Sequence, residues 1–250
     1  MRPAFLILAL ALPACAGPSA PGTPVGALPA GPAERTRVAI RPSDGGPATV
    51  TLHVDGVGCG HPDRAVLDLA WGWLADSRAR PSALGRAAAA RGLGTVAPDP
   101  AHAAETYGVT LWLADPSVEA THVAVRLARY ALDVMLRDGI PDAELARTQA
   151  DLARLGAAGG CDAPTAGPQT RDAVVPVLRR HLAGADGRLR PHRIGIATPH
   201  GAALAAALLA DRPSRRRTPG PQPDWVRVED QVVLTFPLRL SAADVEVGGG

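Results

Sequence analysis

Residues 105–114 (ETYGVTLWLA) constrain the possible fold more strongly than any other segment of the chain. Every second side chain there is large and apolar, at Tyr107, Val109, Leu111 and Leu113. Successive residues of a β-strand point to opposite faces, so this period of two predicts a strand that is buried on one side. The apolar face of such a strand must be covered by a second layer of structure.

Similar patterns predict the remaining elements. We expect strands over residues 37–41, 49–57 and 193–198, with further strand-like segments at 226–229 and 232–240. We expect helices over residues 62–76, 82–91, 117–137, 141–155, 171–182 and 201–210. Ser117 is a helix-capping residue type, and Gly92 and Gly139 are suited to helix ends. Together these elements predict an α+β fold, with an antiparallel or mixed β-sheet and helices packed on one face.

The N-terminus carries a short apolar run, residues 4–12 (AFLILALAL), between Arg2 and Cys15. A helix that crosses roughly 30 Å of hydrocarbon needs about 20 apolar residues, so this run predicts a secretory signal over residues 1–14 rather than an anchor. The sequence Leu-Pro-Ala-Cys resembles the lipobox of bacterial lipoproteins, and that resemblance implies that Cys15 becomes lipidated. The alternative is an ordinary signal peptide that is cut near Ala16.

Residues 16–34 consist almost entirely of Pro, Gly and Ala, and such a composition cannot bury enough apolar surface to order itself. We therefore expect residues 15–35 to be a lipidated tether, residues 36–240 a single α+β domain and residues 241–250 a flexible tail. The expected location is the cell envelope, with a membrane anchor in the outer membrane that faces the periplasm.

Charge and composition exclude one class of partner. The net charge is +2, aromatic residues make up 3% of the chain, and all of its basic residues apart from histidine are arginines. Nucleic-acid binding is not expected, because it requires a basic surface interleaved with aromatic side chains. Apart from Cys15, the cysteines are Cys59 and Cys161, which form a possible disulfide in an oxidising compartment.

The candidate metal ligands cluster in one segment, as His53, Cys59, His61 and Asp63. Imidazole and thiolate groups suit zinc or copper, so these four residues form a weak alternative metal site. The competing interpretation is a polar strand face followed by a turn and a helix cap, because the spacing matches no established zinc pattern. No cofactor is expected. The chain also lacks the Gly-Lys-Ser/Thr of a P-loop and the Gly-x-Ser-x-Gly of a hydrolase elbow.

Several segments of residues 37–240 follow one another in a recognisable order. A helix and turn (ALGRAAAARGLGTVAPDP) precede a strand and a long helix (TYGVTLWLADPSVEATHVAVRLARYALDVML). A loop and helix (DGIPDAELARTQADL), a strand and helix (RIGIATPHGAALAAALLADRP) and a last strand (VVLTFPL) then follow. This order resembles a single repeat of the insulinase (pitrilysin) family of zinc peptidases, and the resemblance implies the α+β fold of that repeat.

The catalytic residues of that family are missing. Active members carry His-x-x-Glu-His on the first helix, where two imidazoles bind zinc beside a glutamate base. Here the helix reads AVLDLAWGWLAD, and its only acids are Asp68 and Asp76. Members that lack zinc can supply an Arg-x6-Tyr pair, but Arg86 is followed seven residues later by Leu93. The resemblance thus implies a catalytically degenerate repeat with no catalytic residue.

These observations lead to one functional expectation and two alternatives. We expect a membrane-tethered, non-catalytic peptidase homologue that acts as a partner or scaffold in the cell envelope, with a possible protein partner of the same family. The first alternative is a metal-dependent hydrolase that uses the His53, Cys59, His61 and Asp63 cluster. The second is an envelope ligand-binding lipoprotein unrelated to peptidases.

Overall fold

A computed structural model describes eight stretches of the chain: residues 36–43, 46–76, 78–99, 106–155, 169–184, 189–190, 192–210 and 241–248. Several predictions fall outside these residues, namely the signal segment, Cys15, the tether, Cys161 and the strand-like segments between 226 and 240. The described residues form six α-helices and a six-stranded sheet.

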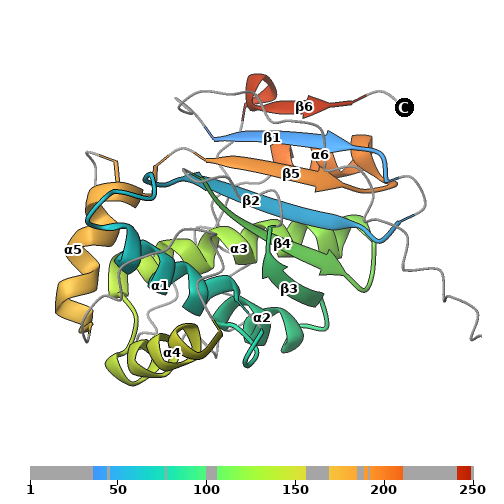
Figure 1. Ribbon diagram of the computed structural model, residues 1–250. Coiled ribbons are helices and arrows are strands. Elements are labelled where there is room, and N and C mark those ends of the chain that lie inside the picture. The colour runs from blue at the N-terminus through green and yellow to red at the C-terminus, as the bar shows by residue number, and fades with distance from the viewer. Residues whose placement is uncertain are drawn as a thin grey trace, which may run out of the picture.

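The strands are β1 (Arg37–Arg41), β2 (Thr49–Asp55), β3 (Gly94–Pro98), β4 (Thr106–Leu113), β5 (Arg193–Ala197) and β6 (Val245–Val247). They lie in the order β3-β4-β2-β5-β1-β6 (Figure 1). Strand β1 is parallel to both β5 and β6, and the other neighbouring pairs are antiparallel. The predicted α+β fold with a mixed sheet is confirmed.

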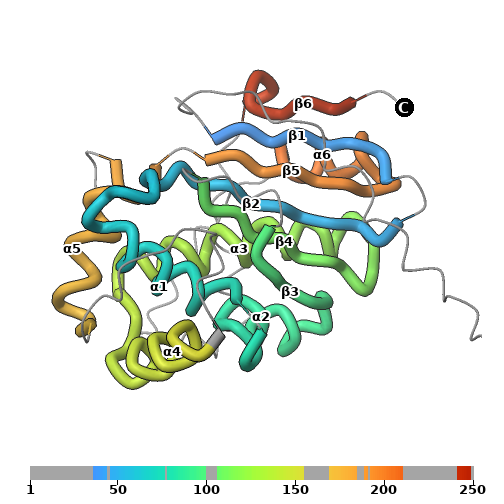
Figure 2. Tube along the Cα trace, in the orientation of Figure 1, coloured from blue at the N-terminus to red at the C-terminus, as the bar shows by residue number. Residues whose placement is uncertain are grey.

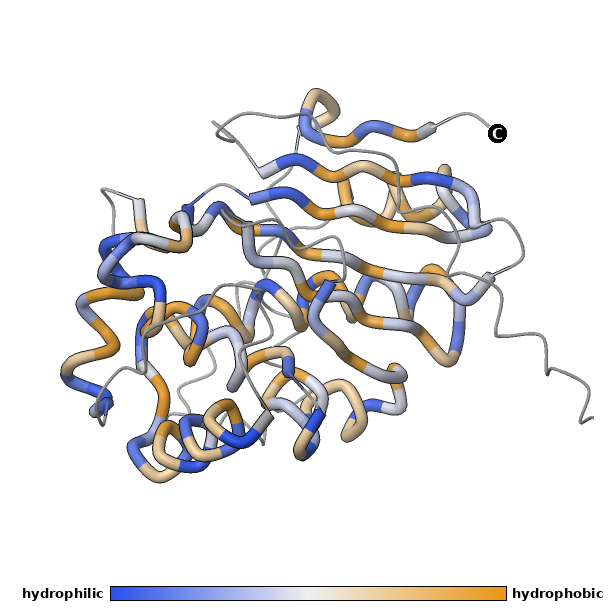
Figure 3. The backbone as a smooth tube through the Cα atoms, in the orientation of Figure 1, coloured by the Kyte–Doolittle hydropathy of each residue, from blue (hydrophilic) through white to orange (hydrophobic). Residues whose placement is uncertain are grey.

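Hydrophobic and hydrophilic residues alternate along the strands (Figure 3), and because successive residues point to opposite faces, the two faces of the sheet differ in character. On one face, the fully buried Val50 lies between Leu111 on β4 and Ile196 on β5. On the other face, Thr51 lies beside Thr110, and their hydroxyl oxygens are 3.0 Å apart. The period of two that is visible in the sequence therefore sorts core residues from polar ones.

The helices are α1 (Arg64–Ala75), α2 (Ala83–Ala89), α3 (Val118–Asp138), α4 (Asp142–Leu155), α5 (Arg171–Leu182) and α6 (Gly201–Ala210). Contacts at both ends of the sheet place helices on the apolar face. Tyr107 of β4 bonds to Asp68 of α1, and the start of α6 lies against the Ile40 side chain of β1. All six predicted helices are present, with ends within a few residues of the expected ones.

Helix α3 shows how the local sequence sets these ends. The Ser117 side chain accepts a hydrogen bond from the backbone N–H of Ala120, which satisfies one of the free donors of the first turn. Gly139 follows the helix with φ of +73°, a conformation that favours glycine. Both ends agree with the sequence prediction.

Two strands were not expected. Strand β6 pairs with β1 from Val38 to Ile40, so the flexible tail predicted from residue 241 is wrong for residues 241–248. Strand β3 forms an edge of the sheet and ends at Pro98, a residue that edge strands tolerate because they have a free hydrogen-bonding side. None of the described helices is long and apolar enough to cross a membrane.

Candidate functional site

Helix α1 is the element that would carry catalysis in an insulinase-type peptidase, and here its first turn forms a buried ion pair. The Arg64 side chain is fully buried, and its Nε donates to Asp68 Oδ1 at 2.8 Å. Its Nη1 donates to the carbonyl oxygen of Val57 at 2.7 Å, and its guanidinium lies 4.9 Å from the centre of the Tyr107 ring. The Tyr107 hydroxyl donates to the same Asp68 oxygen at 2.7 Å.

This arrangement does not fit the catalytic zinc ion of the insulinase-type peptidases. Helix α1 contains no His or Glu, and Asp68 is held by a cation and a phenol. The Asp76 carboxylate, which follows the helix, is bound by the Arg78 guanidinium at 2.6 Å. Burial and the adjacent Asp68 charge raise the pKa of Tyr107 far above its ordinary value, so the phenol keeps its proton.

The four-residue metal cluster predicted from the sequence is split by the structure. His53 lies on β2, where its Nε2 is hydrogen-bonded to Asp99 after β3. Cys59 is disulfide-bonded, so its thiolate is not available as a metal ligand. Both other cysteines, Cys15 and Cys161, lie outside the described residues, and the Cys59–Cys161 pairing stays a prediction. The four residues therefore do not form one metal site.

His61 and Asp63 instead contact a residue that is distant in sequence, His181 in the last turn of α5. The Nε2 atom of His181 lies 2.8 Å from Asp63 Oδ2. The rings of His61 and His181 stand edge to face, with centroids 5.1 Å apart. One ligand atom from each of the three residues lies within 4.8 Å of the other two. These side chains form the His61–Asp63–His181 cluster.

Neighbouring side chains determine the charge of the Asp63 carboxylate in this cluster. Asp63 occupies the N-cap position of α1, and its carboxylate also accepts from Arg180 Nη1 at 2.6 Å. The hydrogen bond from His181, together with Arg180, lowers the pKa of Asp63, while partial burial acts in the opposite direction. The carboxylate is thus ionised at neutral pH. Sequence reasoning missed His181, because no local pattern links it to a residue 118 positions earlier.

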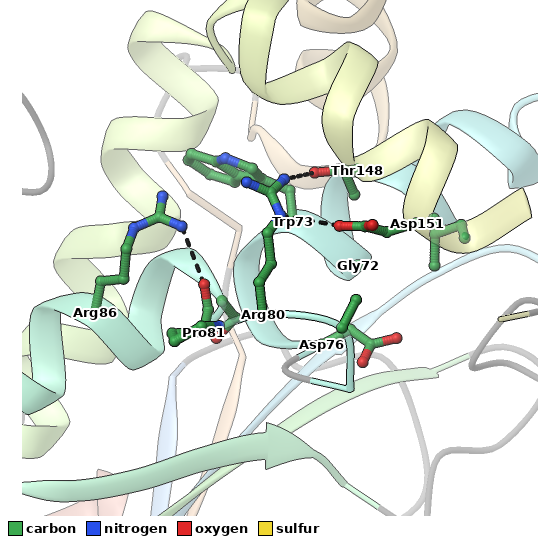
Figure 4. A pocket seen from close by; sticks show the side chains of 11 residues that line it. Gly72, Trp73, Asp76, Arg80, Pro81, Arg86, Thr148 and Asp151 are labelled. Carbon is green, nitrogen blue, oxygen red and sulfur yellow. Dashed lines mark hydrogen bonds and ion pairs between the residues drawn. The ribbon is translucent and has the colours of Figure 1, made fainter. Parts of the chain in front are cut away.

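A shallow pocket between α1, α2 and α4 is a second candidate site (Figure 4). Arg80 crosses it and donates to Asp151 at 3.0 Å, to Thr148 at 3.0 Å and to Glu144 at 3.2 Å. Three acceptors on α4 thus bind one guanidinium from the loop before α2. This arrangement holds α4 in place and gives Arg80 a structural role.

Comparisons with known proteins bear on the fold. No protein-family model matches the sequence, and no curated protein matches it. A peptidase M16 inactive domain from Pseudomonas fluorescens is similar in structure, with a TM-score of 0.50 and 20% identity over 66% of this chain and 43% of that chain. Weaker similarities link the chain to an inactive peptidase domain from Bordetella parapertussis (TM-score 0.41, 18% identity, 60% of this chain and 94% of that chain) and to pitrilysin (TM-score 0.42, 15% identity, 65% and 20%).

The chain spans less than half the length of the Pseudomonas fluorescens structure. Its described residues have the mixed sheet and helical layer expected of an insulinase-type repeat, and the similarity to the M16 inactive domain confirms that fold.

Proposed function

We propose that this chain is a membrane-tethered, non-catalytic homologue of the insulinase-type zinc peptidases, and that it acts as a partner or scaffold in the cell envelope. The observation that carries the proposal is the first turn of α1, where Arg64, Asp68 and Tyr107 form a buried structural network. A zinc peptidase needs imidazole ligands and a free carboxylate base on this helix.

The chemistry of Asp68 supports a non-catalytic role. A general base must accept a proton from water, and a metal ligand must offer a lone pair. The Asp68 Oδ1 atom accepts from the Arg64 guanidinium and from the Tyr107 hydroxyl. Its Oδ2 atom has no hydrogen-bond partner but is buried from solvent, and α1 carries no imidazole that could share a metal ion with it. The similar structure from Pseudomonas fluorescens is itself described as an inactive domain.

The similarity to the Pseudomonas fluorescens structure supports a partner role. The region similar to this chain makes up 43% of that structure, so in that protein a similar domain is accompanied by further residues. We propose that the partner of this chain is another protein of the same family or a second copy of the chain.

The tether rests on Cys15 and the apolar run before it. Stable anchoring by lipid requires more than one acyl chain, which a lipoprotein cysteine carries. We expect Cys15→Ser to abolish incorporation of a labelled fatty acid and to move the protein from the membrane fraction to the soluble fraction. A Cys15→Ser protein that remains equally membrane-bound would contradict the tether.

The absence of catalysis is tested directly with a mixed library of quenched fluorescent peptides. The purified full-length chain, supplied with zinc, is expected to cleave no faster than buffer, while an active insulinase-type peptidase cleaves in parallel. Cleavage that a chelator abolishes and added zinc restores would overturn the non-catalytic assignment.

A further inference from the structure

The His61–Asp63–His181 cluster joins two elements that are distant in sequence. His61 lies in the turn before α1, Asp63 occupies the N-cap position of α1, and His181 belongs to the end of α5. Figure 2 shows α5 beside the stretch of chain that leads into α1. We propose that these three side chains bind a divalent ion of the zinc class, which ties the end of α5 to the start of α1.

The ligand types favour such an ion. Two imidazoles and one carboxylate suit zinc, nickel or copper, whereas magnesium prefers oxygen ligands alone. With bonds of 2.0–2.2 Å, the ligand atoms of a tetrahedral zinc ion lie roughly 3.3 Å apart. The three ligand atoms already lie within 4.8 Å of one another, so a small rotation of side chains completes the site.

The backbone around His61 restrains these side chains. The backbone N–H of His61 donates to Gly58 at 3.0 Å, and its carbonyl oxygen accepts from Arg64 at 3.0 Å. The disulfide at Cys59 lies two residues before His61. The Asp63 and His181 side chains are 14% and 15% exposed, whereas His61 is exposed and leaves a path for the ion. The backbone N–H of Asp63 also donates to His61 Nδ1 at 3.1 Å, so the fold restrains all three side chains.

Arg180 is the internal competitor for Asp63. Its guanidinium binds the carboxylate at 2.6 Å, but its side chain is 62% exposed and can turn into solvent. A divalent ion takes the place of this contact and of the hydrogen bond from His181. Removing the guanidinium should therefore strengthen metal binding, an effect opposite to that of removing a ligand.

The test is isothermal titration of the purified full-length chain, freed of metal and of any histidine tag. We expect one zinc ion per chain with a Kd in the micromolar range or below, and no binding of magnesium. His61→Ala and His181→Ala should each weaken binding at least tenfold, whereas Arg180→Gln should tighten it roughly three- to tenfold because a nearby positive charge is lost. His200→Ala, which removes another exposed histidine, should change nothing.

Saturating zinc should also raise the melting temperature of the unaltered chain by several degrees but not that of His61→Ala. His61 is exposed, so this variant keeps the fold and separates metal binding from unfolding. The proposal is overturned by an absence of zinc binding at micromolar concentrations, by binding that survives both histidine substitutions, or by binding that His53→Ala alone abolishes. None of these results bears on the proposed partner role, which does not depend on the metal.

Discussion

His53 on β2 and Asp99 after β3 are hydrogen-bonded across Gly108, which lies on the strand between them. A methyl group added at Gly108 would lie 2.5 Å from the Asp99 Cβ atom and 3.2 Å from His53 Cδ2. The first distance is too short for two carbon atoms, so Gly108 is the residue that permits this contact. We expect Gly108→Ala to lower the free energy of unfolding by about 1–3 kcal/mol, measured by urea denaturation.

Gly46→Ala is the matched control, because nothing lies within 4 Å of the added carbon. This variant should unfold within about 0.5 kcal/mol of the unaltered chain. Equal stability of the two variants would show that the His53–Asp99 contact is not built around Gly108.

The buried ion pair of α1 gives a second prediction. Arg64→Met leaves the Asp68 carboxylate in the interior without its cation, which should cost about 3–5 kcal/mol in the free energy of unfolding. The double variant Arg64→Met with Asp68→Leu should recover more than half of that loss, because no unpaired charge remains. Arg78→Met breaks an ion pair in which the arginine is 42% exposed, and should cost at most about 1 kcal/mol. A loss of similar size for Arg64→Met and Arg78→Met would contradict this account.

His192 makes stability depend on pH. Its side chain is buried, and burial together with the nearby Arg129 charge lowers its pKa from 6.5 to about 3. The unfolded chain therefore takes up a proton between pH 6.5 and pH 3 that the folded chain does not. This residue's contribution is complete above pH 6.5 and is lost as the pH falls, by up to about 1.4 kcal/mol per pH unit.

Urea denaturation between pH 7 and pH 4 measures this effect. The His192→Gln variant should lose stability more slowly on acidification, with a slope that is smaller by up to about 1.4 kcal/mol per pH unit. The His200→Gln variant should follow the unaltered chain. Identical slopes for His192→Gln and the unaltered chain would mean that folding does not lower the pKa of His192.

The elements that the sequence predicted well are those with strong local signals. The alternation in β4 and the caps of α3 at Ser117 and Gly139 depend on residues that are neighbours in the chain. Strand β6 has only three residues and becomes a strand through its pairing with β1, about two hundred positions earlier. Such pairing leaves no local pattern, and residues 241–248 therefore looked like a tail.

The candidate site was predicted in part for the same reason. His61 and Asp63 stand two residues apart and were recognised as possible ligands, but proximity in sequence also drew in His53 and Cys59. The sheet register places His53 beside Asp99, and the disulfide removes Cys59. The third member, His181, arrives through the packing of α5 against α1, which no spacing in the sequence encodes.

The partner role is tested most directly by the molecular mass of the complex that contains this chain. The full-length chain is expressed in bacteria and extracted from the cell envelope in mild detergent. Its mass is measured by size-exclusion chromatography with light scattering, and the detergent contribution is subtracted. We predict a protein mass of at least two chains, made up of this protein and a stoichiometric insulinase-type partner or a second copy, identified by mass spectrometry. A protein mass of one chain, with nothing co-purifying, would contradict the account.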